Sequence, residues 1–199
     1  VTTTCFAMPQ SNSVPFLDVG ATYVELKEKI DSAIHRVLDS NNYILGSEVA
    51  DFEDEYSKYV SASYCVGVAN GLDALKLALR AAGVEEGDEV IVPAHTFIAT
   101  WLAVTQLGAR LVPIEPEVGG FNIDPKLVEL AVTERTKAIV VVHLYGEPAQ
   151  LDEILEIGNR HQIPIVEDAA QAHGALYKGT KIGAHSDIVA WSFYPSKNL

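Results

Sequence analysis

The sequence predicts an α/β fold in which helices cover both faces of a mostly parallel β-sheet. Short runs rich in Val and Ile alternate with stretches of helical period along most of the chain, which is the order of a parallel sheet with crossover helices. In addition, the runs at residues 138–143 (AIVVVH) and 163–168 (IPIVED) are almost continuously apolar, as strands covered on both faces are. We therefore expect a three-layer α/β/α arrangement.

The first part of the chain predicts two helices and no strand. Residues 1–14 are polar and aperiodic, so we expect a flexible leader there. Apolar residues recur at steps of three and four over residues 23–38 and 47–60, and Ser47 is a candidate N-cap of the second helix. Between these helices, residues 41–46 form either a plain turn or a segment near a ligand.

Beyond residue 60, strands and helices alternate. The predicted strands are residues 64–69, 89–92, 110–114, 138–143, 163–166 and 188–193. The predicted helices are residues 72–82, 98–107, 125–132 and 151–161, whereas residues 178–183 predict a turn. In sheets of this kind ligands bind outside the carboxyl ends of the strands, so functional side chains are expected there.

Composition narrows the function classes. The chain has 199 residues with 48% hydrophobic content and two cysteines, Cys5 and Cys65, which are not in a metal-binding spacing. No apolar run approaches the roughly 20 residues that span a bilayer, and no secretory signal is visible, so we expect a cytoplasmic protein. The formal charge of −13 argues against a nucleic-acid partner. An anionic ligand must then be held by local donors.

Two strand ends offer groups suited to a flat, anionic ligand. In the run ANGLDAL, Gly71 lets the backbone approach a ligand, and the N–H groups of Gly71 and Leu72 at a helix start form an anion site. A tight turn capped by Asn70 explains the same residues equally well. In PAHTFIAT, Phe97 can stack on an aromatic ring, although an aromatic residue near a helix start is more often core.

Two further strand ends carry charged groups. The run IPIVED ends at Glu167 and Asp168, and a carboxylate at the end of a buried strand is costly without a cation or hydrogen-bond donors. An N-cap and a metal ligand are the alternatives; the metal is the weaker because only His173 lies at a suitable spacing. The run DIVAWSFYPSKNL brings Ser192 and Lys197 together. Lys197 alone is typical of a surface turn and gains a role only if the other strand ends meet it.

In this order, the segments NGLDAL, PAHTFIAT, VEDAAQAHG and SFYPSKNL resemble those of the pyridoxal 5'-phosphate (PLP) nucleotide-sugar aminotransferases of the DegT/StrS type, which have fold type I, like aspartate aminotransferase. The resemblance covers about residues 14–199. It implies that residues 15–199 are an incomplete PLP-binding large domain without its C-terminal small domain, because family members extend further. We expect such a piece alone to be poorly soluble, since a sheet edge and apolar helix faces would be uncovered.

The resemblance implies a role for each matching residue. Lys197 matches the lysine that forms the Schiff base with the cofactor and moves a proton between substrate and cofactor. Asp168 matches the carboxylate that pairs with the pyridine nitrogen, and Gln171 matches the side chain near the phenolic oxygen. The remaining matches are phosphate contacts by Ser192 and the amides of Gly71 and Leu72, and ring stacking by Phe97. No metal is implied.

The resemblance also implies an activity. It suggests transamination from glutamate to C3 of a dTDP-linked 3-keto-6-deoxyhexose, in a homodimer with shared active sites. Many relatives carry a hydroxyl residue at the position of Leu72, so here a phosphate would depend on the backbone amide and Ser192. The alternatives are a PLP sugar dehydratase, in which histidine replaces the lysine, and a non-catalytic regulator that keeps the cleft. A dehydrogenase-type domain predicts a G-x-G-x-x-G turn, which ANGLDA does not supply.

Overall fold

The structure is a computed structural model, and it describes residues 14–198. Cys5 and nearly all of the predicted leader lie outside the described residues. The chain divides into two units, Val1–Asn41 and Asn42–Leu199. The first unit contains helix α1 (Val19–Ser40), which begins earlier than predicted because the Asp18 side chain accepts hydrogen bonds from two N–H groups of its first turn. The predicted domain boundary after residue 14 stays a prediction.

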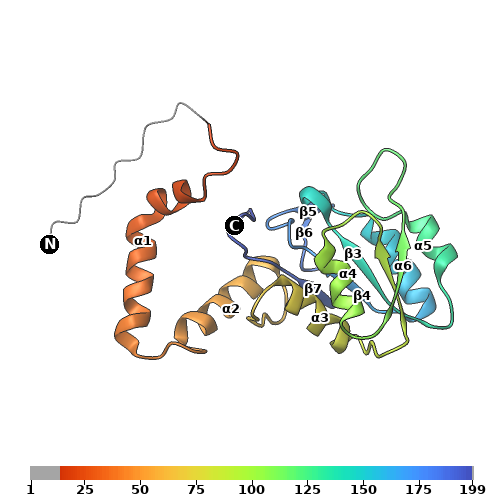
Figure 1. Cartoon of the computed structure of the whole chain (residues 1–199), viewed down its shortest axis with the longest axis horizontal. Coiled ribbons are helices and arrows are strands. Elements are labelled where there is room, and N and C mark those ends of the chain that lie inside the picture. Colours follow the sequence, from red (N-terminus) through yellow and green to blue (C-terminus); the bar gives the residue numbers. More distant parts are fainter. Residues whose placement is uncertain (1–13, 199) are drawn as a thin grey trace. The chain divides into compact units, whose positions relative to one another are not determined.

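A five-stranded sheet forms the centre of the second unit (Figure 1). Its strands are β1 (Glu89–Pro93), β2 (Arg110–Ile114), β3 (Thr136–Val142), β4 (Ile165–Asp168) and β7 (Ile188–Ala190). They lie in the order β2-β1-β3-β4-β7, and all four neighbouring pairs are parallel. The prediction of a mostly parallel sheet is confirmed.

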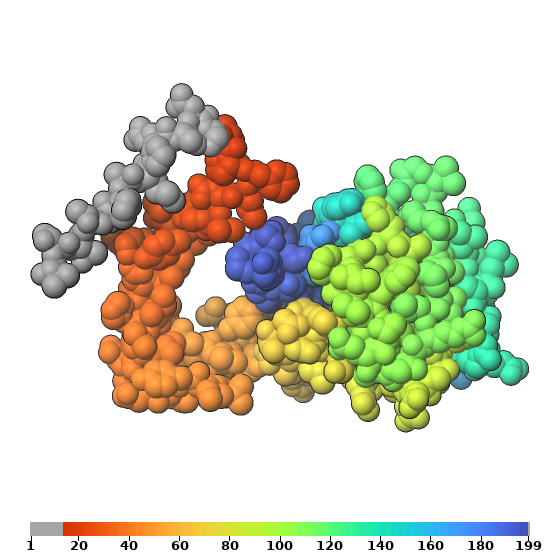
Figure 2. All heavy atoms as spheres, in the orientation of Figure 1, coloured from red at the N-terminus to blue at the C-terminus, as the bar shows by residue number. Residues whose placement is uncertain are grey.

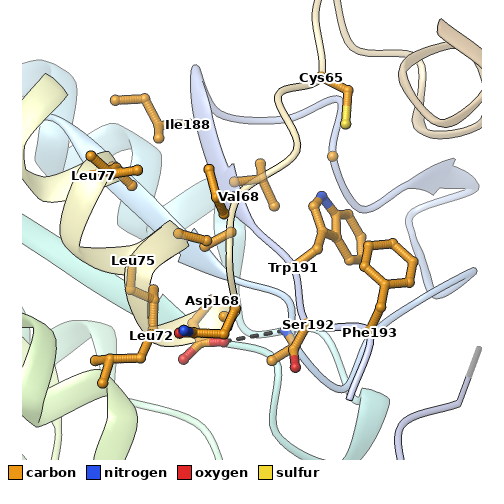
Figure 3. A pocket seen from close by; sticks show the side chains of 18 of the residues that line it. Cys65, Val68, Leu72, Leu75, Leu77, Asp168, Ile188, Trp191, Ser192 and Phe193 are labelled. Carbon is orange, nitrogen blue, oxygen red and sulfur yellow. Dashed lines mark hydrogen bonds between the residues drawn. The ribbon is translucent and has the colours of Figure 1, made fainter. Parts of the chain in front are cut away.

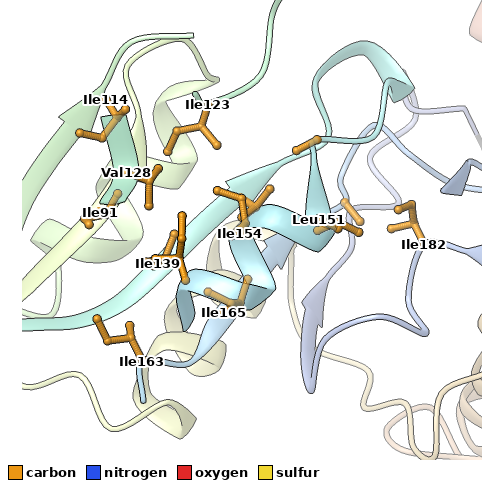
Figure 4. Close-up of a cluster of buried hydrophobic side chains, with 14 of the residues drawn as sticks. Ile91, Ile114, Ile123, Val128, Ile139, Leu151, Ile154, Ile163, Ile165 and Ile182 are labelled. Carbon is orange, nitrogen blue, oxygen red and sulfur yellow. The ribbon is translucent and has the colours of Figure 1, made fainter. Parts of the chain in front are cut away.

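Helices cover both faces of this sheet. They are α3 (Gly71–Ala81), α4 (Ile98–Thr105), α5 (Pro125–Ala131) and α6 (Leu151–His161). The second unit also contains α2 (Ser47–Val60) and a short 3₁₀ helix η1 (Leu144–Gly146) after β3. Val90 and Val166 belong to the core that includes α3 and α4, whereas Ile91 and Ile165 belong to the core that includes α5 and α6 (Figure 4). Successive strand residues point to opposite faces. The three-layer arrangement is therefore confirmed.

The predicted strand at residues 64–69 is wrong. These residues carry no strand pairing, and Val66 is 74% exposed although its neighbours are apolar. A strand exists through hydrogen bonds to an adjacent strand, and none of the strands among residues 14–198 pairs with this segment. The composition of the segment is typical of a strand, but the structure gives it no partner.

Two smaller differences concern a cap and a turn. Ser47 is not the N-cap of α2: Gly46 occupies that position, and no side chain caps it. The predicted turn at residues 178–183 includes part of a hairpin of β5 (Leu176–Tyr177) and β6 (Thr180–Lys181). Its two connecting residues both have positive φ, as a type I' turn requires.

No helix within residues 14–198 is long and apolar enough to cross a membrane.

Candidate active site

A cavity of about 1540 Å³ opens at the carboxyl ends of β4 and β7, beside the start of α3. It exceeds the roughly 300–1,000 Å³ of typical small-molecule sites. It is lined by all of the predicted site residues, namely Gly71, Leu72, Phe97, Asp168, Gln171, Ser192 and Lys197. In Figure 3, Asp168, Leu72 and Ser192 approach one another from three elements. Figure 2 shows the last residues of the chain, in blue, against the yellow surface of α3.

The start of α3 has the geometry of an anion site. Asn70 caps the helix, since its side chain accepts a hydrogen bond from the Asp73 N–H and its carbonyl accepts one from Ala74. Helix geometry therefore leaves the N–H groups of Gly71 and Leu72 without an intrahelical acceptor. The turn capped by Asn70, which the sequence offered as an alternative, is present and leaves these two donors available for a phosphate.

Ser192 approaches this helix start because Gly71 has no side chain. A Cβ atom at Gly71 would lie 3.0 Å from the Ser192 Cβ and 3.3 Å from its Oγ. Such distances are shorter than ordinary van der Waals contacts, so only glycine leaves room for the segment after β7. The close approach brings the Ser192 hydroxyl next to the N-terminal amides of α3. Backbone and hydroxyl donors can then converge on one anion.

Asp168 is the last residue of β4, and it is only 6% exposed. Its Oδ2 accepts a hydrogen bond from the Thr100 hydroxyl at 2.8 Å, and its Oδ1 accepts one from the Ala170 N–H at 3.2 Å. Burial raises the pKa of Asp168 above its usual range in spite of these bonds. Both donors are neutral, and no cationic side chain among residues 14–198 hydrogen-bonds this carboxylate. A protonated ring nitrogen would supply the missing positive partner.

Thr100 is a functional residue that the sequence reading missed. It lies in the first turn of α4, and its hydroxyl is also 2.8 Å from that of Thr96. Both threonines occur in the motif PAHTFIAT, four residues apart. This spacing puts two hydroxyls on one side of a helix start, which is a signal for a polar partner in the neighbouring strand.

Gln171 has a fixed amide orientation. The Tyr145 backbone N–H donates to the Gln171 Oε1 at 2.7 Å. Since a backbone N–H can only donate, the oxygen of Gln171 must face Tyr145, and its NH₂ group is free to donate elsewhere. Tyr145 reaches this position with φ +58°, a left-handed conformation that is strained for a bulky residue. No local sequence pattern predicts this contact.

Lys197 lies in the last described turn, where its N–H donates to the Tyr194 carbonyl at 2.8 Å. Phe97 directly precedes α4 and is 67% exposed. It is therefore not a core residue, which was the alternative interpretation, although its stacking role stays a prediction. No group of three or more His, Cys, Asp or Glu within residues 14–198 is placed to hold a metal ion.

Comparison with known proteins agrees with this geometry. The DegT/DnrJ/EryC1/StrS aminotransferase family matches residues 24–199. The chain is 56% identical to the dTDP-3-amino-3,4,6-trideoxy-alpha-D-glucose transaminase of Streptomyces venezuelae over 94% of this chain and 49% of that protein. It is 55% identical to the "Erythromycin biosynthesis sensory transduction protein EryC1" of Saccharopolyspora erythraea over 94% of this chain and 51% of that protein.

Solved structures agree as well. The crystal structure of S. venezuelae DesV in complex with a ketimine intermediate superposes with a TM-score of 0.92 at 56% identity, covering 94% of this chain and 50% of DesV. The chain thus spans about half the length of the curated relatives it matches. The family match and these identities lead to one conclusion: the chain belongs to the DegT/DnrJ/EryC1/StrS aminotransferase family.

Proposed function

We propose that the whole protein is a PLP-dependent aminotransferase that acts on a nucleotide-linked keto sugar. The observation that carries the proposal is the environment of Asp168, a buried carboxylate with neutral hydrogen-bond donors only. The same cavity contains a lysine and an anion site. A ring nitrogen, a carbonyl group and a phosphate are the three parts of PLP that these groups would recognise.

Different residues of the cavity would hold different parts of such a cofactor. The amides of Gly71 and Leu72, together with the Ser192 hydroxyl, hold the phosphate. Asp168 stabilises a proton on the ring nitrogen because a desolvated carboxylate favours a neighbouring cation. Gln171 directs its NH₂ group at the phenolic oxygen. When bound, PLP supplies an electron sink at the substrate carbon.

Lys197 and Phe97 act at the reacting face. The Lys197 amine would be the group that holds the cofactor through its carbonyl and moves a proton near the substrate carbon, for which part of the amine must be neutral. Phe97 lies over the ring and excludes water from one side. These roles need a lysine at position 197, so they separate an aminotransferase from the related sugar dehydratases, in which histidine replaces it.

The substrate part of the proposal is supported by the names of relatives. The two relatives that are 56% and 48% identical are dTDP-3-amino sugar transaminases. We therefore propose a dTDP-linked 3-keto-6-deoxyhexose as the acceptor, with amination at C3 and glutamate as the donor. A cytoplasmic homodimer with shared active sites completes the proposal.

The experiment uses the whole protein with added PLP. We expect visible absorbance from the lysine-bound cofactor, bleaching of that absorbance by glutamate, and amination of a dTDP-linked 3-keto sugar. Lys197→Ala should abolish the visible absorbance, and the exposed Lys126→Ala is the matched control. Absence of the band in the parent protein would refute the PLP assignment. A band without turnover on any nucleotide sugar would favour a regulator, in keeping with the names of two relatives, a sensory transduction protein and a pleiotropic regulatory protein.

A further inference from the structure

Asn198 follows Lys197 directly and makes two hydrogen bonds to one residue. Its Oδ1 lies 2.8 Å from the His173 ring Nδ1, and its Nδ2 donates to the His173 carbonyl at 3.0 Å. The carbonyl can only accept, so the Asn198 NH₂ group must face it. The Asn198 oxygen therefore faces the ring, and Nδ1 of His173 carries a hydrogen.

Burial and packing against two aromatic rings hold the His173 ring in place. It is 8% exposed, and its ring lies 5.1 Å from the ring of Trp191 and 5.1 Å from that of Phe193. Burial lowers the pKa of His173, and the charge of Lys197 lowers it further. A neutral ring has a single N–H, and the bond to Asn198 uses it.

The contact joins the two turns that carry the reacting groups. His173 lies in the turn that follows Asp168 at the end of β4 and that also contains Gln171, whereas Asn198 directly follows Lys197 in the other turn. Within its own turn, Lys197 is held by a backbone bond to Tyr194. A lysine side chain is flexible, so the position of its Cα decides where the amine can reach.

We propose that Asn198, anchored on His173, is a positioning residue that holds Lys197 within reach of the carbonyl of a cofactor bound over Asp168. This inference rests on the proposed function. In the step it serves, the Lys197 amine adds to the carbonyl carbon, a C=N bond replaces C=O, and the oxygen leaves as water with the two amine protons. The phosphate and ring contacts involve other residues, so Asn198 assists capture and not recognition.

Pyridoxamine 5'-phosphate separates these two effects because it has no carbonyl to condense with lysine. The experiment compares the whole parent protein with Asn198→Ala, with Asn159→Ala on the exposed face of α6 as the matched control. The rate of capture of PLP is followed by absorbance, and borohydride reduction with peptide mass analysis gives the fraction of Lys197 modified. Affinity for pyridoxamine 5'-phosphate is measured by fluorescence.

We expect Asn198→Ala to slow capture by about tenfold, in line with the loss of two hydrogen bonds, and to change pyridoxamine 5'-phosphate affinity less than twofold. Asn159→Ala should change neither quantity. Equal capture rates in Asn198→Ala and the parent would refute the positioning role. A matched loss of capture and pyridoxamine 5'-phosphate affinity would also refute it, because Asn198 would then maintain the whole site. A parent protein that leaves Lys197 unmodified would instead refute the proposed function.

Discussion

Glu167 and Asp168 are adjacent carboxylates at the end of β4, and they meet opposite environments. Glu167 is fully buried on one face, where His143 Nε2 lies 2.7 Å from its Oε2 and both the N–H and the hydroxyl of Ser186 donate to its Oε1. Burial opposes ionisation of Glu167, but the hydrogen bonds from His143 and Ser186 outweigh it and lower the pKa of Glu167. Asp168, on the other face, has neutral donors only and a raised pKa.

This difference shows how the surroundings of a buried carboxylate indicate whether its partner is another residue or a ligand. The chain supplies both oxygens of Glu167 with donors, because the Ala149 N–H donates to His143 Nδ1 and leaves Nε2 as the ring donor, so Glu167 is internally satisfied and joins the ends of β3 and β4. Burial of Asp168 costs folding free energy, because within residues 14–198 it forms no ion pair and the charge of Lys197 offsets the burial only in part. A carboxylate in that condition, facing a cavity, is one whose positive partner is a ligand.

The largest expected effect comes from Asp168→Asn in the whole protein. The substitution keeps the shape and removes the charge, so PLP should still bind while turnover falls on the order of 10²–10³-fold, as for the loss of one electrostatic contact in a transition state. Steady-state kinetics with a dTDP-linked keto sugar measures it. Unchanged turnover would remove the role of Asp168 at the ring nitrogen.

Glu167→Gln should affect the stability of the protein and not its catalysis. The glutamine oxygen can still accept from His143, but its NH₂ group then faces the Ser186 N–H, which loses its acceptor. We expect the free energy of unfolding to fall by about 1–3 kcal/mol, as for an unsatisfied buried donor. Urea unfolding of the whole protein measures this loss. A variant as stable as the parent would show that Glu167 is not the satisfied member of the pair.

The pH dependence of stability should separate the two groups in cofactor-free protein. The folded-state pKa of Asp168 is raised from 3.8, so its contribution is present below about pH 3.8 and is lost as pH rises through the folded value. The folded-state pKa of Glu167 is lowered from 4.5, so its contribution is present above about pH 4.5 and is lost as pH falls.

Both directions of pH dependence can be tested by measuring urea midpoints across this pH range for the parent, Asp168→Asn and Glu167→Gln. Asp168→Asn should gain stability relative to the parent as pH rises from 4. Glu167→Gln should lose less stability than the parent as pH falls below 4.5. Each pKa unit corresponds to about 1.4 kcal/mol. Parallel curves for all three proteins would contradict the opposite shifts.

The smallest expected effect is that of Thr100→Val. It removes the hydroxyl that donates to Asp168 at 2.8 Å, and the charged form of Asp168 becomes harder to maintain. We expect roughly a tenfold lower kcat/KM, equivalent to about 1.4 kcal/mol. The acidic limb of the pH profile should move to higher pH. Thr105→Val is the matched control, since its hydroxyl bonds only to a helix carbonyl. An equal fall in both variants would argue against a specific role.

The centre of the sheet could be predicted because β1, β3 and β4 are almost entirely buried. That burial requires continuous apolar runs, and the carboxyl end of β4 at Asp168 marked the site, whereas Lys197 lies beyond the end of β7 at Ala190. Residues 64–69 show the limit of the argument: composition favours a strand, but pairing depends on a neighbour that local sequence does not specify. The spacing of Thr96 and Thr100 signals a polar partner but cannot identify it as Asp168, because the contact joins distant segments. The strained backbone of Tyr145 is imposed by tertiary contacts and leaves no local pattern.

The close approach of Gly71 and Ser192 has a consequence for how this site can change by mutation. A methyl group at Gly71 would lie 3.0 Å from the Ser192 Cβ, so Ser192 would have to move by a few tenths of an ångström, and the crowding would lessen if Ser192 became glycine at the same time. The two positions, remote in sequence, should therefore show epistasis, with single and double substitutions departing from additivity. Libraries aimed at altered cofactor or substrate preference should vary them jointly, because a scan of single positions would miss combinations in which the second substitution relieves the first.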